Sequence, residues 1–102
     1  MIHVIATIDL KPGKRDEFLG ILRGNLPNVR AEDGCLAYDP TADLATGIAA
    51  QIPVRSDVVT IVERWRDLAA LQAHLAAPHM VTYRSQVKDL VQRVSLQVLQ
   101  HV

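Results

Sequence analysis

The first ten residues alternate between two kinds of side chain. Apolar residues occupy one face, at Ile2, Val4, Ala6, Ile8 and Leu10, while the other face is mixed, with His3, Ile5, Thr7 and Asp9. A period of two with many β-branched residues predicts a strand over Met1–Leu10.

A helical period follows the turn signal Lys11-Pro12-Gly13. From about Lys14 the apolar residues recur every three or four positions, at Phe18, Leu19, Leu22, Leu26 and Val29. Pro27 is expected to kink or briefly interrupt this helix, because proline lacks a backbone donor. Gly34, in Glu32-Asp33-Gly34, is a plausible C-terminal stop.

The middle of the chain contains two strands and a long loop. Cys35–Asp39 is short and strand-like, and Asp57–Trp65 is predicted as a strand. Residues 41–56 show no period, yet they are rather apolar for a solvated loop. Because long loops in compact domains commonly act as functional lids or are disordered, we expect a possible pocket lid here.

Two helices separated by Pro78 are predicted in the last third, followed by a strand over Val94–Val102. Asp67 is a natural N-cap for the first helix. The core residues expected in this first helix are Leu68, Leu71 and Leu75. Those of the second, from about His79 to Gln92, are Met80, Tyr83, Val87, Leu90 and Val91.

The resulting order β-α-β-β-α-β predicts a single α+β domain over residues 1–102 with the ferredoxin-like plan, four antiparallel strands with helices on one face. Val58-Val59-Thr60-Ile61-Val62 is apolar on both faces, although helices can cover only one. Since large apolar patches usually mark interfaces, we expect a homodimer that packs sheet against sheet.

Charge and composition narrow the function classes. Lys plus Arg equals Asp plus Glu at 11 each, without a basic cluster, so a nucleic-acid partner is not expected. No apolar run approaches the roughly 20 residues that span a bilayer, so no membrane partner is expected either. The start, MIHVIATIDL, lacks signal-peptide features, and the single Cys35 excludes an internal disulfide. The expected location is cytoplasmic.

Three segments carry a resemblance to a known family: GKRDEFLGIL, EDGCLAYD and VERWRDLAALQAHLAAPH. In this order and spacing they resemble the antibiotic biosynthesis monooxygenase (ABM) superfamily. The resemblance implies a dimeric α/β barrel and a monooxygenase without cofactor or metal that oxidises a small aromatic, quinol or polyketide-like compound with dioxygen. An isomerase or degradative enzyme acting on a small carbonyl compound, or a non-catalytic ligand-binding domain, remains an alternative.

The same segments contain all of the candidate site residues except Tyr83, which follows the third segment. His74 matches the family's His in Ala-Leu-x-x-His-Leu, and a near-neutral imidazole can accept a proton from substrate. On the predicted helix it lies at the border of the buried stripe, so a packing role is the alternative. Glu63, the second catalytic candidate, could orient His74, or it could form an ion pair with Arg64, Arg66 or a residue of the dimer partner. The candidate substrate-binding residues are Trp65, Tyr38, Tyr83 and His79, and for Trp65 a place in the core is the alternative.

Metal and haem chemistry are not expected from the residues. His74 and His79 are five apart across Pro78, whereas metal-binding pairs on one helix prefer a spacing of four. The superfamily's haem-degrading branch has a first-strand Asn, a helical Trp and a later His ligand. Here Ile5-Ala6-Thr7 contains no Asn, His74 occupies the Trp position, and Tyr83-Arg84 replaces the His.

Overall fold

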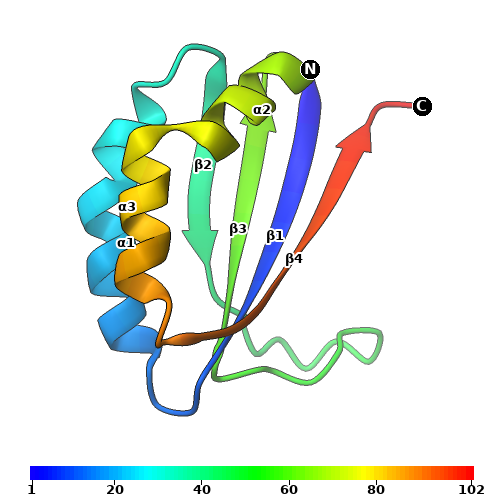
Figure 1. Ribbon diagram of the computed structural model, residues 1–102. Helices are drawn as coiled ribbons and strands as arrows, with labels where there is room; N and C mark the ends of the chain where they lie inside the picture. Colours follow the sequence, from blue (N-terminus) through cyan, green and yellow to red (C-terminus); the bar gives the residue numbers. More distant parts are fainter.

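The computed structural model describes residues 1–102 as a four-stranded antiparallel sheet with three helices on one face (Figure 1). The elements in chain order are β1 (Ile2–Leu10), α1 (Arg15–Arg30), β2 (Cys35–Thr41), β3 (Val58–Trp65), α2 (Leu68–Ala76), α3 (Pro78–Val87) and β4 (Val91–Gln100). The order of strands across the sheet is β2-β3-β1-β4. The predicted ferredoxin-like α+β class is confirmed, with the second helical region divided into α2 and α3.

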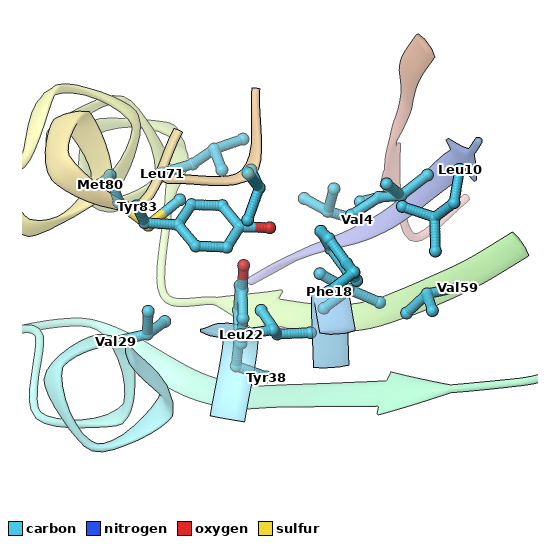
Figure 2. Packing of buried hydrophobic residues seen from close by; sticks show 14 of the residues in the cluster. Val4, Leu10, Phe18, Leu22, Val29, Tyr38, Val59, Leu71, Met80 and Tyr83 are labelled. Atoms are coloured by element: carbon cyan, nitrogen blue, oxygen red, sulfur yellow. The ribbon is translucent and has the colours of Figure 1, made fainter. Parts of the chain in front are cut away.

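The central strands present the predicted alternation to the helices. Val4, Ala6, Ile8 and Leu10 of β1 are all buried, as the period of two requires. β1 pairs with β3 on one side and with β4 on the other. The core therefore lies between the helices and the β2-β3-β1 part of the sheet. Figure 2 shows Phe18 and Leu22 of α1 in this core.

Pro27 does not interrupt α1, so of the two predicted effects, a kink or a brief interruption, the interruption is wrong. The helix continues to Arg30, and the backbone N–H of Ala31 still bonds to the Pro27 carbonyl. Pro27 lies in the last turn, where it removes a single intrahelical hydrogen bond. Val29 is 1% exposed beyond it, so burial of this side chain holds the final turn in place.

The second helical region begins and divides as predicted. The Asp67 side chain accepts a hydrogen bond from the Ala70 backbone N–H at 2.9 Å and caps α2. Pro78 occupies the first turn of α3, where a backbone N–H would have no acceptor within the helix.

The core residues predicted for the second helix are confirmed at Met80, Tyr83, Val87 and Leu90, which are all buried, whereas those predicted for α2 need correction. The buried face of α2 contains Ala70, Leu71 and His74, whereas Leu68 and Leu75 are 53% and 39% exposed. The buried face of α2 is thus rotated about the helix axis relative to the predicted face, and His74 lies on it. α3 ends at Val87, so Val91 opens β4 rather than closing the helix.

The segment between β2 and β3 has no helix or strand, as predicted, and an Asp43–Arg55 ion pair at 2.8 Å closes it into a loop. Figure 1 shows this loop at the end of the sheet opposite α2. No helix of the protein has both the length and the apolar character needed to cross a membrane. The cytoplasmic location stays a prediction.

Candidate active site

A cavity of about 440 Å³ lies between the sheet and helices α2 and α3. Most of its wall is apolar, formed by residues of β1, β3, β4 and both helices. Four of the six predicted site residues line it, namely Tyr38, Glu63, His74 and Tyr83. A largely apolar cavity with a few convergent polar groups is the usual form of a small-molecule site.

A turn after α1 brings a carboxylate to His74. Gly34 has φ +84°, and a Cβ at this position would lie 2.6 Å from the Ala70 Cβ of α2. Only glycine permits both this backbone conformation and this close approach. The turn is thereby held against α2, and the Glu32 carboxylate (Oε2) lies 2.7 Å from His74 Nδ1.

Glu32 is the functional candidate that sequence reasoning missed. In the sequence, Glu32 belongs to Glu32-Asp33-Gly34, the segment expected to end the first helix. It lies 42 residues from His74, so the pattern of nearby residues does not indicate their contact. Its one sequence signal was the first position of the EDGCLAYD segment.

His74 is more buried than predicted, at 2% exposed rather than at a border. Its ring lies 4.6 Å from that of Trp65 and 5.4 Å from that of Tyr38, measured between centroids. Burial lowers the pKa of His74 from its ordinary value, and the Glu32 carboxylate opposes part of that effect. At neutral pH the imidazole is therefore neutral and able to accept a proton.

The hydrogen bond to Glu32 determines which nitrogen of His74 can act. With Nδ1 donating to the carboxylate, Nε2 is the unprotonated nitrogen. Nε2 has no protein partner, yet it is not sealed from solvent, and His74 lines the cavity. The acceptor nitrogen is thus available to a ligand.

Glu63 forms none of the contacts within the chain that were predicted from the sequence. It does not bond to His74, Arg64 or Arg66; instead its Oε1 accepts the Trp65 indole N–H at 2.9 Å. The side chain is 4% exposed, and desolvation raises its pKa to about 7 despite the opposing indole hydrogen bond. A carboxyl group that titrates near neutrality can either donate or accept a proton in the cavity.

The two tyrosines contribute hydroxyl groups from opposite layers. Tyr38 comes from β2 and Tyr83 from α3, and Figure 2 shows the Tyr38 hydroxyl directed toward the Tyr83 side chain. Burial raises the pKa of both phenols well above the ordinary range, so both remain protonated donors. Neither hydroxyl has a protein partner or is sealed, so both can bind a substrate oxygen.

Trp65 and His79 do not line the cavity. Trp65 is fully buried behind it, where its indole supports His74 and Glu63. His79 lies in a groove between α1 and α3, and its Nε2 is 3.5 Å from the Glu32 carboxylate. His79 is therefore linked to the site by the Glu32 carboxylate, which also contacts His74.

The remaining His and Cys residues lie outside the site. The half-buried His3 and the exposed His101 bond to each other at 2.9 Å, while Cys35 is half-buried with its pKa raised by desolvation. No group of three or more His, Cys, Asp or Glu side chains is arranged to hold a metal ion. Residues 42–57 contribute nothing to the wall of this cavity, and the lid role of this loop stays a prediction.

Comparison with known proteins identifies the family and the fold of the chain. Residues 1–86 match the model of the antibiotic biosynthesis monooxygenase family. The chain is 36% identical to "Probable quinol monooxygenase YgiN" of Escherichia coli, over 98% of this chain and 97% of that protein. Among solved structures, PA3566 from Pseudomonas aeruginosa superposes with a TM-score of 0.80 at 31% identity, covering 99% of this chain and 93% of that one. Rv0793 from Mycobacterium tuberculosis gives a TM-score of 0.80 at 30% identity, with coverages of 99% and 94%.

Proposed function

Because the chain belongs to the antibiotic biosynthesis monooxygenase family, a monooxygenase family, we propose that it oxidises a small aromatic quinol with dioxygen and without a cofactor. The observation that carries the proposal is the pairing of a buried, neutral His74 with Glu32 at the wall of an apolar cavity. The name of the Escherichia coli relative supports a quinol as the class of substrate.

His74 would act as the general base. Its Nε2 accepts the proton of a ring hydroxyl, and the imidazolium that forms is stabilised by the Glu32 carboxylate at Nδ1. An apolar wall raises the energy of the resulting phenolate and so favours electron transfer from it to dioxygen. Glu32 is here a positioning residue, since it acts through His74.

The overall reaction needs no external reductant. A quinol and one dioxygen give a hydroxylated quinone and one water, so the quinol supplies all the electrons. One oxygen atom enters the ring and the other leaves as water, which takes up two protons. Glu63, with a pKa of about 7, is suited to deliver one of them, and the Tyr38 and Tyr83 hydroxyls to hold the substrate oxygens.

The test is oxygen uptake with a panel of naphthoquinols, corrected for uncatalysed oxidation. His74→Gln should lower turnover by about 10²–10⁴-fold, the usual contribution of one general base. Glutamine is the preferred replacement because His74 is buried and alanine would also leave a void. His101→Gln, an exposed control, should leave turnover unchanged.

Two outcomes would contradict the proposal. Turnover of the isolated protein that consumes no oxygen would favour the isomerase alternative. Full activity of the His74→Gln variant, by contrast, would leave His74 with a packing role only.

We also propose that the working form is a homodimer. β4 is an edge strand whose helix-side residues Val94, Leu96 and Val98 are 45–54% exposed, and no helix lies over it in Figure 1. On the opposite face of the sheet Ile5 and Val62 are also incompletely covered. A second copy packed sheet against sheet would cover the helix-free face that carries Ile5 and Val62, which supports the assembly expected from the sequence.

A further inference from the structure

The cavity has two chemically different ends. At the α2–α3 junction its wall contains the groups with acid, base and hydroxyl chemistry, among them Glu63 and His74. Toward the start of β4 it is lined by Val87, Val91 and Val94, together with the exposed cation Lys88. Lys88 and the acid–base groups therefore lie toward different ends of a cavity whose wall is mostly apolar.

Two exposed cations line the cavity, and no exposed carboxylate does. Arg84 and Lys88 both line it and both are exposed, whereas the only lining carboxyl group is the buried Glu63. Neither cation forms an ion pair in the protein. Arg84 donates to the Leu75 carbonyl, which leaves Lys88 as the cation with no protein partner. Asp89, although adjacent in sequence, does not line the cavity.

The distance between the two ends of the cavity can be obtained in two independent ways, from the rise along α3 and from the rise along the strands. Met80 of α3 and Lys88, the helical C-cap residue that follows α3, both line the cavity, and eight residues of helix rise about 12 Å. On the sheet, Val4 pairs with Glu63 at one end and Ile8 pairs with Val94 at the other. Four residues of strand span about 13 Å. The cavity is thus longer than a two-ring aromatic system.

From this we infer that the substrate is an elongated aromatic acid, whose ring hydroxyl lies at His74 and whose carboxylate lies at Lys88. The inference deepens the proposed function and rests on it in taking this cavity as the substrate site. The apolar middle accepts the ring system and its chain, and the cationic border selects an anion over a neutral compound by charge complementarity.

Calorimetric binding of unreactive phenols tests the inference without requiring turnover. The probes are para-hydroxyphenylbutanoate, its uncharged amide, and the shorter para-hydroxybenzoate. The butanoate should bind the wild-type protein about fivefold to tenfold more tightly than the amide, and this preference should weaken at high salt. The benzoate is too short to reach Lys88 from His74 and should gain much less from its charge.

Lys88→Gln provides the decisive variant, and Lys14→Gln the matched control. Lys14 is also exposed but does not line the cavity. Lys88→Gln should abolish the preference for the butanoate while leaving amide binding within about twofold. Lys14→Gln should retain the wild-type preference.

Several results would overturn the inference. These are equal affinity for acid and amide, a preference that survives in Lys88→Gln, or the absence of binding by either long probe. A lysine that is merely solvated would give the first of these. Failure of the proposed function would appear separately, as the absence of oxygen uptake with quinols despite normal binding of the acid.

Discussion

The buried Glu63 carboxyl makes the stability of the protein depend on pH in a defined direction. Desolvation raises its pKa from 4.5 to about 7 in the folded protein. Between these values the unfolded chain has lost the proton that the folded protein retains. Stability is therefore fully present below about pH 4.5, declines as the pH rises, and levels off above about pH 7.

The magnitude follows from the two pKa values. One pKa unit corresponds to about 1.4 kcal/mol, so the full shift lowers the free energy of unfolding by about 3 kcal/mol. Glu63→Gln removes the titration but keeps an oxygen that can accept the Trp65 indole N–H. The variant should therefore be little changed near pH 5 and more stable than the wild type by about 2–3 kcal/mol near pH 8.

Urea unfolding at a fixed protein concentration, followed by the fluorescence of the single tryptophan, measures this difference. His74 titrates in both proteins, so its contribution largely cancels. Glu17→Gln, an exposed change on α1, should alter stability by less than about 0.5 kcal/mol over the same range. A Glu63→Gln difference that is the same at about pH 5 and about pH 8 would refute a buried, neutral carboxyl group.

Three further predictions concern packing, haem and assembly. Trp65→Ala should lower the free energy of unfolding by about 3–5 kcal/mol, measured by circular dichroism, because it empties a fully buried site; a change below about 1 kcal/mol would contradict the core role. Haemin titration should give no sharp Soret band at equimolar ratio, because the first-strand Asn and the helical Trp of the haem-degrading branch are missing; a stoichiometric complex would show otherwise. Sedimentation should give a dimer whose interface buries at least about 1,200 Å². An 11.3 kDa species at micromolar concentration would exclude this assembly.

The sequence predicted those features that depend on nearby residues. The alternation in β1, the Asp67 cap and the division at Pro78 each arise from a few adjacent positions, and each was confirmed. The order of elements then led to the fold class. Three of the four candidate residues at the cavity, Tyr38, Glu63 and His74, belong to two of the recognised segments, and Tyr83 comes from the helix that follows them.

Only the tertiary structure decided which side chains meet. The Glu32–His74 contact joins residues 42 positions apart, and it depends on Gly34 allowing the turn to approach α2. The rotation of α2 that buries His74 and exposes Leu68 was likewise invisible, because alanine and leucine on a short helix define no single apolar stripe. The opposition of Lys88 to the acid–base end is also a product of packing, since α3 and β1 extend along the same cavity. Local patterns thus determined the elements, whereas long-range packing determined the chemistry of the site.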